Sequence, residues 1–240
     1  MEIVLVPAFK DNYIFLAHSA DTRETMVVDP GEAGPVLAAA AARGWQITHI
    51  LNTHWHADHT GGNAGVKAAT GATLIGPSEN GRIPGLDRTV GEGDRVAFGG
   101  EEGEVIAIPG HTLGHIAFHF GRPGVAFVGD TLFALGCGRL LEGTPTQMFA
   151  SLRRLMALPD PTIVYCAHEY TEANLRFAES LGQPSPALAQ RAEIIRLARA
   201  AGTPTVPTTI ALERSTNPFV RADTVARFAE LRAAKDVFRG

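Results

Sequence analysis

The sequence has few cysteines, no long apolar run and no excess of positive charge. Its two cysteines, Cys137 and Cys166, cannot form a disulfide framework, so a reducing, cytoplasmic setting is expected. No segment reaches the roughly 18 consecutive apolar residues of a membrane span, and residues 1–16 lack the pattern of a signal peptide. The formal net charge of −4 argues against a nucleic-acid binder. We therefore expect neither a membrane partner nor a nucleic-acid partner.

The order of predicted elements indicates two parts. Residues 1–166 alternate groups of strands with helices expected over 35–43, 63–70 and 146–158, which predicts two sheets packed together with helices outside. After His168 no strand is expected, and helices are predicted over 171–181, 186–201 and 222–238. The sequence therefore predicts a strand-rich domain of residues 1–168 and a small helical domain of residues 169–240.

A run of metal-binding side chains, His54-Trp55-His56-Ala57-Asp58-His59, follows the strand expected over 47–53. In an extended segment alternate side chains share a face, so His54 and His56 can bind one ion. Asp58 and His59, around the turn, then point toward a second position. One ion rarely takes so many ligands from one short loop, so the run predicts two divalent ions.

Three more candidate ligands each follow an apolar strand-like run: His111, Asp130 and His168. Taken alone, a histidine after a strand is usually a surface residue, and Asp130 could cap a turn. Together with the histidine run they predict a complete ligand set at one rim of the sheets. The remaining candidates lie within strand patterns and are expected to be packing or surface residues: His18, His49, His115 and His119.

The ligand set divides into two groups of three: His54, His56 and His111 for one ion, and Asp58, His59 and His168 for the other. Asp130 can bridge both ions because a carboxylate has two oxygens. A shared position stays open for water, and paired ions about 3.5–4 Å apart lower the pKa of a bridging water toward about 7. The set therefore favours hydrolysis by a metal-bridging hydroxide, with Asp58 and Asp130 as catalytic residues. Histidine and carboxylate ligands suit zinc, with iron and manganese as alternatives.

These residues resemble the ligand pattern of the metallo-β-lactamase superfamily, which implies an α/β fold, an αββα four-layer sandwich with the metals at one rim. The whole chain also resembles the glyoxalase II (hydroxyacylglutathione hydrolase) family. The matching blocks are residues 7–13, 129–133, 136–139, 142–144, 168–171 with 174–175, 216–219 and 232–236. The resemblance implies hydrolysis of S-2-hydroxyacylglutathione, such as S-D-lactoylglutathione, to glutathione and D-lactate in methylglyoxal detoxification.

The C-terminal segment fits this small-molecule substrate, because a glutathione thioester carries two carboxylates. The last twenty residues hold five Lys or Arg against three acids, and on a helix Arg232 and Lys235 share a face. Such a charged face is usually solvated, but the resemblance implies that both residues bind substrate. It implies the same for Arg139, at a position where the family commonly has lysine, and for Tyr170. Leu141 replaces a common tyrosine, which removes a hydroxyl donor.

Two alternatives to the hydrolase remain within the superfamily. One is an iron-dependent glutathione persulfide dioxygenase, and the other is a different hydrolase such as a β-lactamase. The presence of His168 together with Asp58 and His59 favours a dinuclear site. Asp130 stands where many β-lactamases have cysteine, which argues against that activity. We expect the protein to be a monomer.

Overall fold

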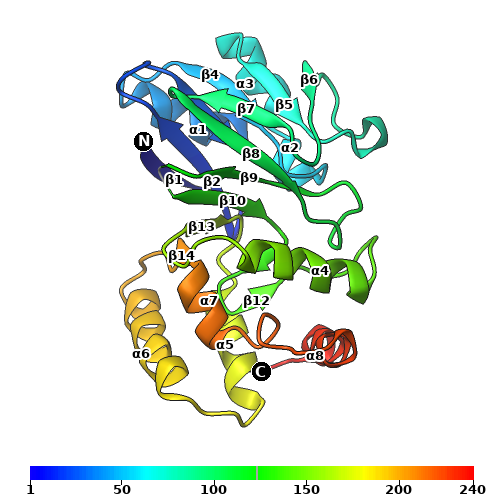
Figure 1. The fold of residues 1–240 in the computed structure, drawn as a ribbon. Coiled ribbons are helices and arrows are strands. Elements are labelled where there is room, and N and C mark those ends of the chain that lie inside the picture. Colours follow the sequence, from blue (N-terminus) through cyan, green and yellow to red (C-terminus); the bar gives the residue numbers. More distant parts are fainter. Residues whose placement is uncertain (123) are drawn as a thin grey trace. The chain divides into compact units, whose positions relative to one another are not determined.

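A computed structural model describes residues 1–122 and 124–240, which form two compact units (Figure 1). The first unit contains Met1–Ala107 and Gly114–Gly129. The second unit contains Ile108–Leu113 and Asp130–Gly240. The predicted division into residues 1–168 and 169–240 stays a prediction.

The first sheet of the first unit has six strands in chain order. They are β1 (Glu2–Ala8), β2 (Asn12–His18), β3 (Thr25–Val28), β4 (Ile47–Leu51), β5 (Thr73–Gly76) and β6 (Arg88–Thr89). Strands β1 to β3 pair antiparallel, and β3 to β6 pair parallel. Parallel neighbours need long crossover connections, and α1 (Ala33–Ala41) and α3 (Asn63–Thr70) supply two of them.

The second sheet of this unit contains β7 (Arg95–Phe98), β8 (Glu101–Ala107), β9 (Ile116–Phe120) and β10 (Val125–Gly129), paired antiparallel. Strand β2 lies between two apolar layers, which explains why nearly its whole length is buried. Ile14 and Leu16 join the core formed with the helices, whereas the ring of Phe15 lies 5.8 Å from that of Phe127 on β10. Alternate side chains of one strand therefore join the helices and the second sheet.

The second unit is mainly helical. Its elements are β11 (Leu132–Phe133), β12 (Gly136–Cys137), α4 (Pro145–Met156), β13 (Ile163–Cys166), α5 (Thr171–Ser180), α6 (Pro186–Ala200), β14 (Thr208–Thr209), α7 (Ile210–Thr216) and α8 (Val225–Val237). Helices α4, α6, α7 and α8 begin after Thr144, Ser185, Thr209 and Thr224, whose side chains accept a backbone hydrogen bond from the first turn. Hydroxyl caps of this kind define where a helix starts.

A buried polar network joins α6 and α7 to the β11–β12 hairpin. Glu213 is fully buried and accepts hydrogen bonds from the Arg191 guanidinium, the Leu135 backbone N–H (2.9 Å) and the Asn217 amide (2.8 Å). The Asn217 amide also donates to the carbonyls of Phe133 (3.2 Å) and Gly136 (2.9 Å). Because a buried charge needs partners, this network fixes the hairpin that follows Asp130.

Most predicted elements are confirmed, and two predictions are wrong. The helix over 63–70 is confirmed to the residue, and the other predicted helices are found with shifted ends. The expectation of no strand after His168 is wrong, since β14 pairs with β13, and α7 was missed. Both elements are short, so tertiary contacts rather than local periodicity define them. None of the described helices is long and apolar enough to cross a membrane.

The substitution Glu213→Ala should lower the free energy of unfolding by about 3–5 kcal/mol, because it leaves a buried guanidinium without its carboxylate. Urea unfolding followed by circular dichroism measures this change. The matched control is Glu230→Ala, which removes an exposed ion pair with Arg227 in the same unit. The control should leave the midpoint nearly unchanged. Equal effects of the two substitutions would contradict a stabilising role of the network.

Candidate functional site

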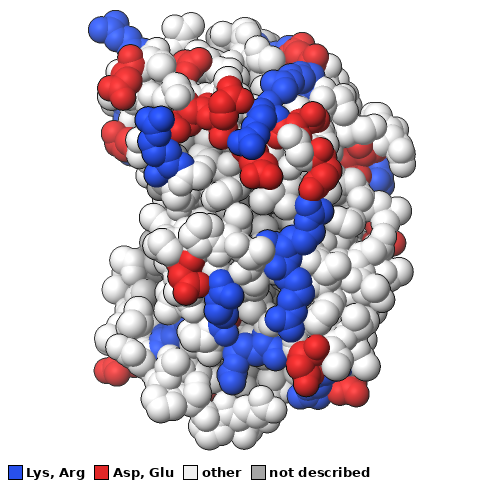
Figure 2. Space-filling view, viewed as in Figure 1, with Lys and Arg blue, Asp and Glu red and all other residues white. Residues whose placement is uncertain are grey.

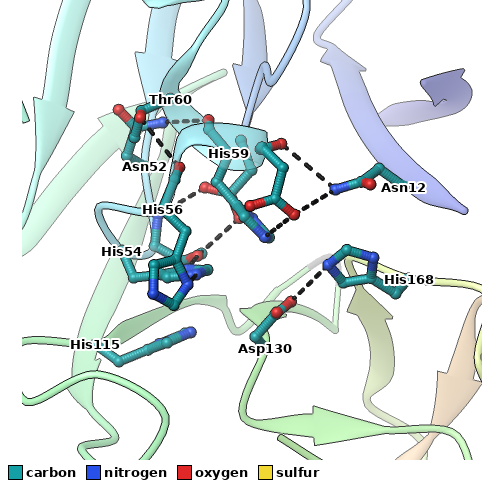
Figure 3. Close-up of polar contacts among 12 residues, drawn as sticks. Asn12, Asn52, His54, His56, His59, Thr60, His115, Asp130 and His168 are labelled. Carbon is teal, nitrogen blue, oxygen red and sulfur yellow. Dashed lines mark hydrogen bonds and ion pairs between the residues drawn. The ribbon is translucent and has the colours of Figure 1, made fainter. Parts of the chain in front are cut away.

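The first unit brings together four of the predicted ligands where β4 ends (Figure 3). His54 Nε2 lies 3.0 Å from His56 Nδ1, and the rings of His54 and His59 are 4.1 Å apart. The short helix α2 (Ala57–Thr60) turns the chain back, so that Asp58 Oδ2 lies 3.4 Å from His59 Nε2. His54 and His59 are buried, whereas Asp58 is partly exposed. Three imidazoles and one carboxylate therefore converge within one short loop.

Asp29 orients this loop and was not singled out from the sequence. It lies directly after β3, the parallel neighbour of β4, with a left-handed backbone (φ 52°). Its buried carboxylate accepts hydrogen bonds from Thr53 N (2.8 Å) and Thr53 Oγ1 (2.7 Å), and it lies 3.2 Å from His59 Nδ1. A carboxylate on Nδ1 leaves Nε2 as the metal-binding atom of His59. The sequence signal for Asp29 is its position: it is an acidic residue at the end of the strand that pairs with β4.

Asn12, at the start of β2, holds Asp58. Its side-chain amide donates to Asp58 Oδ2 at 2.9 Å, and Asn12 is itself buried. The sequence indicated Asn12 only as part of the block of residues 7–13. No local pattern connects it to Asp58, because 46 residues separate the two.

His115 was predicted to be a packing or surface residue, and it packs on a predicted ligand. Its ring lies face to face with that of His54, with centroids 4.5 Å apart and planes 16° apart. The other three unassigned histidines lie elsewhere. His18 stacks on Trp45, and the pKa values of His49 and His119 are lowered, mainly by burial.

The second unit brings together the other three predicted ligands, and in it two histidines face the carboxylate of Asp130. Asp130 Oδ2 lies 3.5 Å from His111 Nε2. Asp130 Oδ1 lies 3.3 Å from His168 Nε2 (Figure 3). All three residues are buried. The two oxygens of Asp130 thus face two different histidines, as expected for a carboxylate that bridges two ions.

Neighbouring groups fix these ligands in place. His111 Nδ1 donates to the carbonyl of Arg139 at 2.9 Å, which directs Nε2 toward Asp130. A side chain at Gly138 would place its Cβ 1.9 Å from the Asp130 carbonyl oxygen, so only glycine fits there. Tyr170 stacks on His168, with centroids 4.7 Å apart and planes 2° apart.

A pocket of about 420 Å³ in the second unit contains all four residues predicted to bind substrate. Its lining includes His111 and Asp130 together with Arg139, Tyr170, Arg232 and Lys235. Figure 2 shows that Lys and Arg side chains are numerous on the visible face of the second unit. The pocket therefore joins candidate metal ligands to a positively charged region suited to an anion.

Two cations of α8 are held inside this pocket at different depths. Arg232 is 5% exposed and donates to the Cys137 carbonyl (2.8 Å) and to Asp236 Oδ1 (2.8 Å). Among the residues that the structure describes, its buried Nε–H has no hydrogen-bond acceptor. Lys235 Nζ donates to the Ala173 carbonyl at 3.0 Å. Burial, together with the charges of Arg232, Arg176 and Arg139, lowers the pKa of Lys235 to about 8, although Asp236 has the opposite effect.

The ligand chemistry of both units fits divalent ions of intermediate hardness. Each group contains only imidazole nitrogens and carboxylate oxygens. Burial raises the pKa of Cys137 to about 11 and that of Cys166 to about 12, so neither thiol ionises readily to act as a thiolate ligand. Histidine and carboxylate ligands of this kind suit zinc, iron or manganese.

Two family models and a curated relative match the chain. A family model described as the Metallo-beta-lactamase superfamily matches residues 10–168, and one described as Hydroxyacylglutathione hydrolase C-terminus matches residues 169–238. A hydroxyacylglutathione hydrolase of Cereibacter sphaeroides is 50% identical, and the match covers 99% of each chain.

Two solved structures are also similar. ETHE1 from Myxococcus xanthus has a TM-score of 0.76 and 28% identity, covering 100% of this chain and 93% of its own. TTHA1623 in a di-iron-bound form has a TM-score of 0.64 and 27% identity, covering 91% of this chain and 100% of its own. With the family models, these matches confirm the predicted α/β fold of the metallo-β-lactamase type and its helical C-terminal part.

The substitution Asp29→Asn should weaken metal binding by roughly 10- to 100-fold, because His59 loses the carboxylate that orients it. Zinc titration against a competing chelator measures the affinity. The control is Asp21→Asn, an exposed acid of the same unit, which should bind zinc like the parent protein. Parent-like zinc affinity of Asp29→Asn would show that Asp29 does not position the ligand.

Proposed function

The chain belongs to the hydroxyacylglutathione hydrolase family of the metallo-beta-lactamase superfamily, and we propose that it hydrolyses the thioester bond of S-2-hydroxyacylglutathiones. S-D-lactoylglutathione is the expected substrate, and glutathione and D-lactate are the expected products. The observation that carries this proposal is the pocket of the second unit. It is lined both by metal-ligand candidates and by four cations, Arg139, Arg232, Lys235 and Arg239.

We assign the seven predicted ligands to one dinuclear centre. His54, His56 and His111 would hold one ion, and Asp58, His59 and His168 would hold the other. Asp130 would bridge them, an assignment supported by its two oxygens facing His111 and His168. Zinc is the expected metal, with iron or manganese as alternatives, and TTHA1623 shows that a related fold can bind two iron ions.

The reaction needs an activated water, a polarised carbonyl and a leaving group. Bound divalent ions would supply Lewis-acid activation of the water and of the thioester carbonyl. Asp58, fixed by Asn12 and partly exposed, can accept a hydrogen bond from the attacking water and orient it. The departing thiolate needs no proton donor, because a thiol with a pKa near about 8.5 is a good leaving group.

Substrate binding is assigned to the pocket residues Arg139, Tyr170, Arg232 and Lys235. Arg139 is largely exposed, and its Nε lies 3.9 Å from Asp236 Oδ1. Because the guanidinium is held only loosely, it can move to bind a substrate carboxylate in a bidentate manner. Lys235 and Arg232 lie deeper and bring positive charge close together, which an incoming carboxylate would neutralise. Leu141 is 59% exposed and offers no hydroxyl to the substrate.

A persulfide dioxygenase is the less supported alternative. The similarity to ETHE1 is 28% in sequence, whereas the hydrolase of Cereibacter sphaeroides is 50% identical over 99% of the chain. The match of residues 169–238 to the hydrolase C-terminus also favours hydrolysis. The predicted cytoplasmic location and monomeric state stay predictions.

The substitution Asp130→Ala should abolish hydrolysis of S-D-lactoylglutathione, with kcat lowered by at least about 100-fold, because the centre loses its shared ligand. Loss of thioester absorbance measures the rate, and elemental analysis counts the metal ions. The control Asp223→Ala removes an exposed acid of the same unit and should retain full rate. A parent protein with two metal ions and no thioesterase activity would contradict the proposed function. Oxygen uptake with glutathione persulfide would then favour the dioxygenase.

The substitution Lys235→Ala should raise KM for the glutathione thioester about tenfold with little change in kcat, because a charge-assisted contact is lost. The pKa of Lys235, near 8, adds a pH dependence. Below pH 8 the ammonium is charged and binds the carboxylate, and above pH 8 the charge is lost, so KM should rise between pH 7 and 9.

The matched control for this titration is Lys235→Arg, since a guanidinium stays charged throughout that range. KM of this variant should be flat from pH 7 to 9. An unchanged KM in Lys235→Ala would show that Lys235 does not bind the substrate, whereas a parent KM independent of pH would show that Lys235 stays charged throughout this range.

A further inference from the structure

His115 lies against a predicted metal ligand without being a predicted ligand itself. Its ring stacks on that of His54, with centroids 4.5 Å apart and planes 16° apart (Figure 3). Both side chains are fully buried. Nothing in the proposed reaction uses His115, although it is fully buried beside the histidine loop.

The backbone holds the two histidines at this separation. The Ile116 N–H donates to the carbonyl of Thr53 at 3.0 Å, which ties the start of β9 to the residue before His54. His115 Nδ1 lies 3.1 Å from the Ile116 carbonyl oxygen. Because a carbonyl can only accept, Nδ1 carries the proton in this contact. The ring is therefore fixed by its own segment, independently of His54.

The ring also fills the space between the ends of β4 and β10. A Cβ atom at Gly129 would lie 2.8 Å from His115 Cε1 and 2.3 Å from Thr53 Oγ1. Gly129 has a left-handed backbone (φ 48°), and it immediately precedes Asp130 in the chain. His115 thus acts as a spacer at the point where two ligand-bearing strands end.

We infer that His115 is a positioning residue whose stacked ring fixes the plane of His54, and so sets the affinity of the metal position that His54 would occupy. The inference rests on the proposed metal-binding role of His54. Thr53 Oγ1 lies 3.1 Å from His54 Nδ1, but a contact at one ring atom still allows the imidazole of His54 to tilt. A flat ring in face-to-face contact removes that tilt, so His54 meets the ion in a prepared orientation. Outer-shell residues that orient metal ligands through hydrogen bonds typically contribute 10- to 100-fold in affinity, and for a stacked ring we expect the lower end of that range.

The inference distinguishes the flat ring from simple filling of space. His115→Phe keeps an aromatic face against His54, whereas His115→Leu fills a similar volume without one. The matched control is His18→Ala, which removes one ring of a second stacked pair in the same unit, His18 and Trp45 (centroids 4.6 Å, planes 9° apart). Zinc affinity by chelator competition and the visible spectrum of the cobalt-substituted protein are measured for all four proteins. Thermal unfolding of the metal-free forms reports on folding.

His115→Leu should bind its weaker zinc ion about tenfold less tightly than the parent protein and shift the cobalt spectrum. His115→Phe should stay within about threefold of the parent affinity, and His18→Ala should match the parent. Equal zinc affinity in the Leu and Phe variants would overturn the inference, because volume alone would then suffice. An equal loss of zinc affinity in His18→Ala and His115→Leu would also overturn the inference. A parent protein that binds no zinc or cobalt would instead refute the proposed metal centre.

Discussion

The carboxylate of Asp29 accepts hydrogen bonds from the backbone and hydroxyl of Thr53 and contacts the imidazole of His59. This buried carboxylate is tolerated because polar donors surround it, and it ties the end of β3 to both ends of the histidine loop. Together with the Ile116 N–H bond to the Thr53 carbonyl and the Asn52 amide bond to the His59 carbonyl, it fixes the path of the chain between β4 and α2. The left-handed backbone of Asp29 shows that the fold accepts local strain to place this group.

Each group of ligands depends on neighbours that are not themselves ligands. In the first unit Asn12 holds Asp58, and His115 stacks on His54. In the second unit the carbonyl of Arg139 orients His111, and Tyr170 covers His168. Such contacts fix the tautomer and ring direction before an ion arrives, so binding requires little reorganisation. Each group of ligands is therefore held by one amide or carbonyl contact and one stacked ring.

The pocket of the second unit places positive charges close together. The electrostatic repulsion between them would be reduced by a bound anion. Burial and the neighbouring arginines lower the pKa of Lys235 to about 8, and Asp236 offsets only part of this repulsion. Arg232 is tied to the Cys137 carbonyl, so its charge cannot turn away to solvent. A carboxylate that enters the pocket would replace like-charge repulsion with attraction, which favours an anionic ligand over a neutral one.

Much of the site could be predicted because its chemistry is concentrated in short sequence patterns. His54, His56, Asp58 and His59 occur within six residues, and His111, Asp130 and His168 each follow an apolar strand. The helices were predictable from periodicity and hydroxyl caps, with errors at their ends. The short elements α7 and β14 were not, because their contacts with distant segments, rather than their own residues, stabilise them.

The sequence by itself determined which atoms can bind metal, which residues carry positive charge near the C-terminus, and the family to which the chain belongs. Only the tertiary structure decided how those groups are oriented. Asn12 lies 46 residues from Asp58, and His115 lies 61 residues after His54, yet both pairs are in contact. Residues so far apart are brought together by strand pairing and sheet packing, which no local pattern encodes.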